Sequence, residues 1–117
     1  MNLETIRNHC IKKAGVTEEF PFDETTLVFK VMGKMFCLTN VEPPLTINVK
    51  CEPEIAIELR EHYDYVLPGY HMNKKHWNTI DLEGIVKDGL VLSWIDDSYN
   101  LVIDSLPNKK KKELNML

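Results

Sequence analysis

The chain has 117 residues, 44% of them hydrophobic and 27% charged, a balance that excludes wholesale disorder and predicts one domain over residues 1–117. Its 14 basic and 18 acidic side chains leave a net charge of −4, which disfavours sequence-independent binding of polyanions. No apolar run is long enough to span a membrane, the start is not typical of a signal peptide, and three cysteines (Cys10, Cys37 and Cys51) favour reduced thiols, so we expect a cytoplasmic protein.

The first segment predicts an amphipathic helix over residues 3–14. Its apolar side chains recur at helical spacing, Asn2 can cap its start, and Gly15 follows its end. Residues 16–24 contain Pro21 and four acidic side chains, and they predict a connecting loop.

The next segment predicts β-structure. Two runs rich in β-forming residues, 26–32 and 35–39, flank a Gly33-Lys34 pair and predict a hairpin in which glycine supplies the positive φ of the turn. Strict alternation of apolar and polar side chains over residues 45–51 predicts a half-buried strand.

The second half of the chain predicts two helices separated by one strand. A helix is expected over residues 53–62, an irregular segment over 65–76, a strand over 77–82 and a helix from Asp88 to the residue before Pro107. The expected buried positions on these helices are Ile55, Ala56, Leu59 and Tyr63, then Val91, Trp94, Ile95, Leu101 and Val102. The lysine-rich tail is either a short helix or a frayed end. The order α-β-β-β-α-β-α indicates an α+β domain with helices on one face of an antiparallel sheet.

Residues 68–79, with the sequence PGYHMNKKHWNT, hold the candidate binding groups. They contain two of the four histidines and no acidic residue. Lys74, Lys75 and Asn73 suit an anion or a nucleic-acid backbone, and Tyr70 and Trp77 suit stacking on a base. The alternative is structural: Trp77 packs in the core, while Asn73 and Asn78 bond to loop backbone groups.

Residue spacing gives little support to metal binding or catalysis. His71 and His76 are five residues apart, which does not place two ligands on one helical face, so we expect no metal and no cofactor. No nucleophile elbow or glycine-rich phosphate loop is present. Asp96 and Asp97 are adjacent on a helix, and we expect them to face solvent rather than act as an acid/base pair. We therefore expect no enzymatic activity.

With these features the sequence resembles the MmcQ/YjbR family of small bacterial proteins. The resemblance covers essentially the whole chain. It rests on the first helix ending at Gly15, the 28–37 hairpin, Lys50-Cys-Glu-Pro53, the 68–79 string, Asp96-Asp-Ser-Tyr99 and Leu106-Pro107. It implies a CyaY-like (frataxin-like) α+β fold and a double-wing mode of DNA binding in which hairpins approach the duplex. Iron delivery is not implied, because the first helix carries Glu4 alone in place of an acidic ridge.

Two functional hypotheses follow. The first is a non-enzymatic DNA-binding protein, in which Lys74, Lys75, Asn73 and His71 contact phosphate and Lys50 and Lys34 add peripheral contacts. The second is a module for a protein or small-molecule partner, in which Tyr70, Trp77 and His76 line a pocket. Neither hypothesis involves a membrane.

Overall fold

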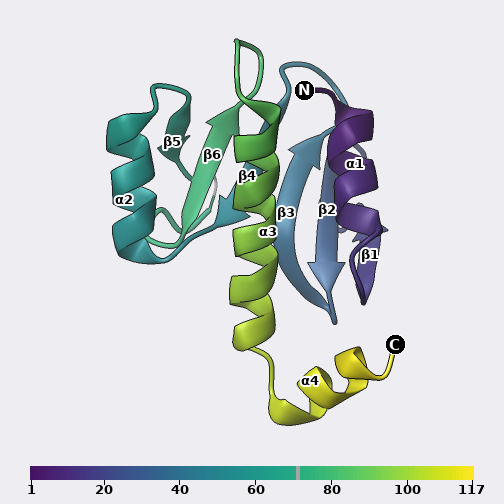
Figure 1. Cartoon of the computed structure of the whole chain (residues 1–117). Helices are drawn as coiled ribbons and strands as arrows, with labels where there is room; N and C mark the ends of the chain where they lie inside the picture. The colour runs from purple at the N-terminus through teal and green to yellow at the C-terminus, as the bar shows by residue number, and fades with distance from the viewer. Residues whose placement is uncertain (71) are drawn as a thin grey trace.

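The computed structural model describes residues 1–70 and 72–117, and Figure 1 shows its arrangement of helices and strands. The strands are β1 (Val16–Glu19), β2 (Thr26–Val31), β3 (Lys34–Asn40), β4 (Thr46–Lys50), β5 (Val66–Pro68) and β6 (Trp77–Asp81). The helices are α1 (Leu3–Ile11), α2 (Pro53–His62), α3 (Asp88–Asp104) and α4 (Asn108–Asn115). All the predicted helices and strands are present. The structure adds two strands, β1 and β5, and the tail forms the short helix α4.

All six strands form one antiparallel sheet in the order β1-β2-β3-β4-β6-β5. Because side chains alternate along a strand, one set faces α1, α2 and α3, which lie on the same side of the sheet (Figure 1). The main core forms there and includes Ile6, Phe29, Ile47, Val49, Ile80, Trp94 and Ile95. The predicted α+β fold with helices on one face is confirmed.

The opposite face of the sheet carries no helix, and we call it the helix-free face. It has a small apolar cluster of its own, in which Val28, Leu38 and Trp77 are buried. Met35 and Met72 pack against this cluster. A loop residue therefore shields part of a face that the helices leave open.

The hairpin between β2 and β3 is present, with its turn one residue earlier than expected. Val31 pairs with Lys34, so Met32 and Gly33 are the two turn residues. Their φ angles are +50° and +87°. Positive φ at both positions is the geometry of a type I′ turn, which matches the twist of the flanking strands.

Two segments expected to lack regular structure contain short edge strands. Residues 16–19 form β1 within the predicted loop, and residues 66–68 form β5 within the predicted irregular segment. Both strands bond to a longer neighbour on one side only, so the pairing comes from β2 and β6 rather than from a local pattern. An ion pair between Lys30 and Glu19 (2.5 Å) reinforces the β1 edge.

Several predicted helix positions need correction. Ala56 is buried on α2, but Ile55 is 47% exposed. The reason is that α2 packs at the β5–β6 side of the sheet, and only a narrow stripe of the helix is buried against it. Leu101 is half-buried, since it borders a groove beside α2. α3 begins at Asp88 as expected and ends at Asp104, and the residue before it, Lys87, makes no side-chain capping hydrogen bond.

The sequence predicted that Asp96 faces solvent, but the structure places its carboxylate in contact with α1 and the residues that follow it. Its Oδ1 lies 2.7 Å from His9 Nε2 and 2.5 Å from Lys13 Nζ, so it joins α3 to α1. The lysine-rich tail forms α4, whose Leu114 is buried. None of the helices in the described parts of the chain has the length and apolar character needed to cross a membrane.

Candidate functional site

The loop between β5 and β6 is closed by bonds within its own backbone. Gly69 N–H donates to the Trp77 carbonyl (2.9 Å), and the Asn73 carbonyl accepts from the N–H groups of His76 (3.2 Å) and Trp77 (2.9 Å). The Asn73 side chain accepts from Lys75 N–H at 2.9 Å. Asn73 therefore shapes the loop, as the structural alternative predicted.

Lys74 is also part of the loop's internal structure. Its Nζ donates to the Gly69 carbonyl at 2.8 Å, and its own carbonyl accepts from the Arg60 guanidinium. Arg60 Nε also donates to Asn78 Oδ1 at 2.7 Å, which connects α2 to both the loop and β6. The bond to Gly69 uses one of the three N–H donors of the Lys74 ammonium group and ties the side chain to the loop, so the predicted phosphate contact would have to share that group with the Gly69 carbonyl.

The predicted stacking role of Trp77 is wrong. The side chain is only 9% exposed and lies in the apolar cluster of the helix-free face, so its ring is not presented to a base. His76 is half-buried, and its carbonyl accepts from Cys51 N–H at 2.7 Å. The predicted contact through His71 lies outside the described residues.

Tyr70 borders a hollow on the helix-free face. The hollow has a volume of about 830 Å³ and is bounded by the loops that follow β1, β3 and β5. Tyr70 (69% exposed) and Phe22 (64% exposed) lie at its rim. The other residues lining it are Asp23, Thr25, Thr26, Leu38, Thr39, Asn40, Glu42, Pro43, Pro44, Thr46, Asn48, Leu67, Pro68, Met72 and Thr79.

The floor of the hollow carries an ordered chain of hydrogen bonds. Tyr70 N–H donates to Thr79 Oγ1 (2.8 Å), and Thr79 Oγ1 in turn donates to Asn48 Oδ1 (2.5 Å). Thr46 Oγ1 donates to Asn40 Oδ1 at 2.9 Å. The Asn48 oxygen accepts from Thr79, and the NH₂ group of the same amide can donate to a bound molecule.

The charges around the hollow are acidic. Asp23 and Glu42 line it, and no basic side chain does so among residues 1–70 and 72–117. The N–H groups of Thr25 and Thr26 donate to Asp23 and lower the pKa of its carboxyl group, which is therefore ionised at neutral pH. This charge disfavours an anionic ligand.

The remaining predicted lysines gather at one end of the sheet. β3 begins at Lys34, β4 ends at Lys50, and Lys75 comes shortly before β6 begins. Since β3, β4 and β6 are antiparallel neighbours, these three positions share an end. The sheet topology thus brings Lys34, Lys50 and Lys75 to the same edge, away from the polar floor of the hollow.

The cysteines are poorly suited to nucleophilic chemistry. Burial raises the pKa of the Cys51 thiol to about 11. A hydrogen bond with Cys10, together with burial, raises the pKa of Cys37 well above its usual value. Both therefore stay as neutral thiols near pH 7. Within the described residues, no group of three metal-ligating side chains lies close enough to hold an ion.

Most residues of the hollow were not singled out by sequence reasoning. The alternation over residues 45–51 does place Thr46 and Asn48 on the face opposite Ile47 and Val49. That signal alone does not reveal a hollow, because the rim comes from loops that are distant in sequence. Tyr70 is the predicted pocket residue that the structure places in it.

Comparison with known proteins decides the family. The YjbR family model matches residues 11–101. The chain belongs to the YjbR family. The uncharacterized protein YjbR of Escherichia coli K12 is 30% identical over the full length of both chains. The uncharacterized protein YbdF of Escherichia coli O157:H7 is 33% identical, over 95% of this chain and 92% of that protein.

Solved structures of similar proteins share the YjbR-family fold described above. Protein DR2400 of Deinococcus radiodurans, whose domain is described as DUF419, superimposes with a TM-score of 0.90. It is 38% identical, and the match covers 97% of this chain and 88% of that one. A crystal structure of a Pseudomonas syringae protein gives a TM-score of 0.73 at 27% identity, over 86% of this chain and 98% of that chain.

Proposed function

We propose that this YjbR-family protein is a non-enzymatic binding protein for a small organic molecule that is neutral or cationic, and that the hollow of the helix-free face is its binding site. The observation that carries the proposal is the combination of an aromatic rim with a hydrogen-bonded polar floor. A volume of about 830 Å³ falls in the range of small-molecule sites, which is about 300–1,000 Å³.

The lining defines the chemistry of the ligand. Leu38 and Met72 offer apolar surface, and Tyr70 and Phe22 offer ring faces at the entrance. The NH₂ group of Asn48 suits a carbonyl or ring nitrogen on the ligand. A flat molecule with an aromatic part and one hydrogen-bond acceptor meets these requirements.

Three probes of matched shape test the charge and the site together: benzamide (neutral), benzamidine (cationic) and benzoate (anionic). Saturation-transfer NMR detects weak binding, and molecules of this size are expected to bind with a Kd of about 1 mM. We expect benzamide and benzamidine to give a signal and benzoate to give a much weaker one, because Asp23 and Glu42 repel it.

Two variants locate the binding. Thr46→Trp fills the hollow and is expected to remove the signal, whereas Thr17→Trp places the same side chain on the same face, on β1, and is expected to keep it. Asn48→Leu is expected to weaken benzamide binding by about tenfold, the value of one hydrogen bond. Equal binding of benzoate, or a signal that survives Thr46→Trp, would contradict the proposal.

DNA binding is a second candidate, favoured by the gathering of Lys34, Lys50 and Lys75 at one end of the sheet. The β2–β3 hairpin tip lies at this end and would act as a wing. Phosphate contacts from a few lysines predict weak binding that falls steeply with salt. Lys74 is not included, because its Nζ bonds to Gly69.

Fluorescence anisotropy with a labelled duplex tests this candidate at two salt concentrations. The double variant Lys34→Glu/Lys75→Glu should lower affinity by tenfold or more and flatten the salt dependence by about two phosphate contacts. Lys12→Glu/Lys87→Glu removes the same charge from exposed positions elsewhere and serves as the control. Equal losses in both variants would mean that no specific DNA surface exists at the sheet end.

A further inference from the structure

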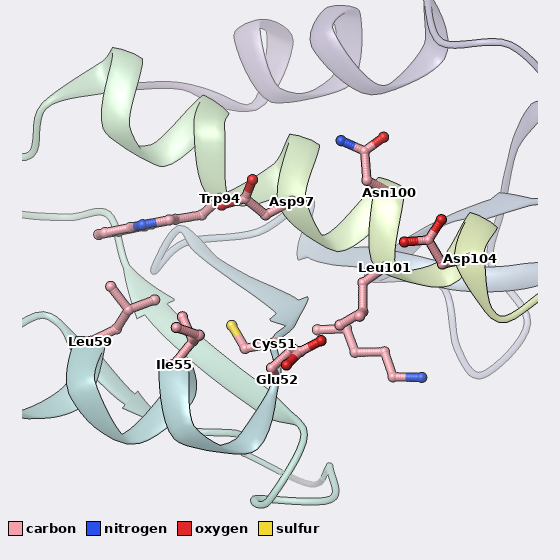
Figure 2. A pocket seen from close by; sticks show the side chains of 10 residues that line it. Cys51, Glu52, Ile55, Leu59, Trp94, Asp97, Asn100, Leu101 and Asp104 are labelled. Atoms are coloured by element: carbon pink, nitrogen blue, oxygen red, sulfur yellow. The ribbon is translucent and has the colours of Figure 1, made fainter.

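A second depression lies on the helix-bearing side of the sheet, in a groove between α2 and α3 (Figure 2). Its volume is about 330 Å³. Trp94 and Leu101 come from α3, Ile55 and Leu59 from α2, and Cys51 lies between them just before α2 begins. Of these side chains Ile55 is the most exposed (47%), Leu59 and Leu101 are half-buried, and Trp94 and Cys51 are nearly buried at the bottom of the groove.

The rim of this groove is acidic. Asp97 and Asp104 follow Trp94 along one side of α3, and Figure 2 shows Asp104 at the same end of the groove as Leu101. Glu52 adds a third carboxylate, against the single ammonium group of Lys50. None of the three carboxylates has an ion pair or a hydrogen bond in the described structure. An apolar floor with this rim suits an apolar segment that carries positive charge.

The chain itself contains a segment of that kind. Residues 109–112 are four consecutive lysines on α4, and Met116 after the helix is 84% exposed. The one buried residue of this helix is Leu114, whose Cδ1 lies 2.6 Å from the position that a Cβ on Gly15 would occupy. Leu117 Cδ1 lies 3.5 Å from the same position, so the C-terminal segment is held at Gly15. Lys109, Lys110, Lys112 and Met116 are exposed, and Lys111 is half-buried.

Within one molecule the two features are not paired. α4 is held by Leu114 near Gly15, and α1 lies on the opposite side of α3 from α2 (Figure 1). Among the described residues, the ion pair made by the lysines of α4 joins Lys110 to Glu113 of the same helix, and none reaches a carboxylate of the groove. The lysines and the groove carboxylates are therefore both left for a partner, and a head-to-tail contact between two copies would join them.

We propose that the α2–α3 groove binds the segment over residues 109–117 of a second copy of this chain. Met116 and its neighbours enter the apolar floor beside Ile55 and Trp94, while the lysines of α4 face Asp97 and Asp104. The contact is heterologous, so a bound pair leaves a groove on one copy and a tail on the other unused, and the assembly grows with protein concentration. Since the charged groups lie at the exposed rim, salt weakens it.

Sedimentation velocity across about 1 μM to 1 mM protein tests the proposal at low and high salt. Native protein is expected to form dimers and larger species as concentration rises, with an affinity at least about tenfold lower at about 500 mM salt than at about 50 mM. A protein that stays monomeric over this whole range at low salt would overturn the proposal.

Charge exchange makes the test specific. Asp97→Lys/Asp104→Lys and Lys109→Glu/Lys112→Glu change exposed residues, and each variant alone is expected to stay monomeric. An equal mixture of the two is expected to associate again, because the tail of the second variant meets the groove of the first with opposite charges. Lys12→Glu/Lys87→Glu, which changes lysines outside both surfaces, should associate like the native protein. Circular dichroism confirms that each variant folds. Association that survives in either single charge-exchanged variant, or a mixture that stays monomeric, would overturn the proposal.

Discussion

Ser98 on α3 joins the helix layer to the sheet at the point where the β3–β4 ladder ends. Its Oγ donates to the Phe36 carbonyl (2.6 Å) and accepts from Lys50 N–H (2.8 Å), just beyond the Cys37–Val49 pair. The side chain is fully buried. A single hydroxyl thus bridges the two strands at a point where their backbones do not hydrogen-bond to each other directly.

Replacing Ser98 with alanine leaves that carbonyl and that N–H without their partner. We expect Ser98→Ala to lower the free energy of unfolding by about 1–3 kcal/mol, the cost of unsatisfied buried groups. Ser93→Ala on the same helix is the control, since Ser93 is exposed and bonds only to Leu90 of its own helix, and its change should stay within about 0.5 kcal/mol. Urea denaturation measures both, and equal losses would refute this role.

Gly15 is required where α1 ends and α4 packs. Its φ is +73°, and an added Cβ would lie 2.6 Å from Leu114 Cδ1 and 3.3 Å from Met32 Sδ. Gly15→Ala is expected to cost about 1–2 kcal/mol for the left-handed backbone alone, with further loss from the contact with Leu114. Gly84→Ala, where a Cβ would meet open space, should change stability little. Thermal or urea unfolding of the two variants decides the matter.

For single residues, the sequence predicted which kinds of contact a side chain can make better than it predicted whether that side chain is exposed to a ligand. Tyr70 does lie at a pocket, and Asn73 does bond to the loop backbone, as the structural alternative expected. Asn78 differs from that expectation, because it donates to the Ala56 carbonyl of α2 and not to a loop group. Lys74 and Trp77 are placed differently from the binding hypothesis. The bond from Lys74 to the Gly69 carbonyl depends on the folded shape of the loop, and the residues next to Lys74 in the sequence do not predict it.

Among the elements, α1 and α3 are joined by a charged contact that depends on pH. Partial burial acts to raise the pKa of Asp96, and hydrogen bonds from Lys13 and His9 outweigh it, so the pKa is lowered from its usual 3.8. A carboxylate with a lowered folded-state pKa stabilises the fold above the unfolded-state value. That contribution is lost as the pH falls through the folded-state pKa.

We therefore expect Asp96→Asn to destabilise the protein at neutral pH and to lose this effect in acid. The difference in unfolding free energy between the native protein and the variant should be constant above about pH 5 and shrink below about pH 4. Asp64→Asn changes an exposed carboxylate and serves as the control. Urea titrations across this pH range measure it, and a difference that persists unchanged in acid would disprove the contact's role.

The elements that the sequence predicted have their own local signals. The alternation over residues 45–51 and the glycine turn of the hairpin are complete within a few residues, and β3 and β4 are where they were expected. β1 and β5 have four and three residues, and each owes its hydrogen bonds to one longer neighbour. Their existence depends on the strand order β1-β2-β3-β4-β6-β5, which no local pattern contains.

At the scale of the whole molecule, the two sides of the sheet have different roles. Helices α1, α2 and α3 form the core on one side, while three loops close over part of the other and leave a hollow of about 830 Å³. The hollow could not be predicted from the sequence, because its rim joins segments near residues 22, 43 and 70 that meet only after the sheet forms. Its acidic rim and polar floor are the observations behind the proposed small-molecule ligand.

The most direct test of this account is a nuclear magnetic resonance titration of ¹⁵N-labelled protein with benzamide. The account predicts that amide shifts concentrate at Leu38, Asn48, Tyr70 and Thr79, with the side-chain NH₂ signal of Asn48 among the largest. Shifts that gather instead around Lys34 and Lys75, or that are absent at saturating probe, would contradict binding in the hollow.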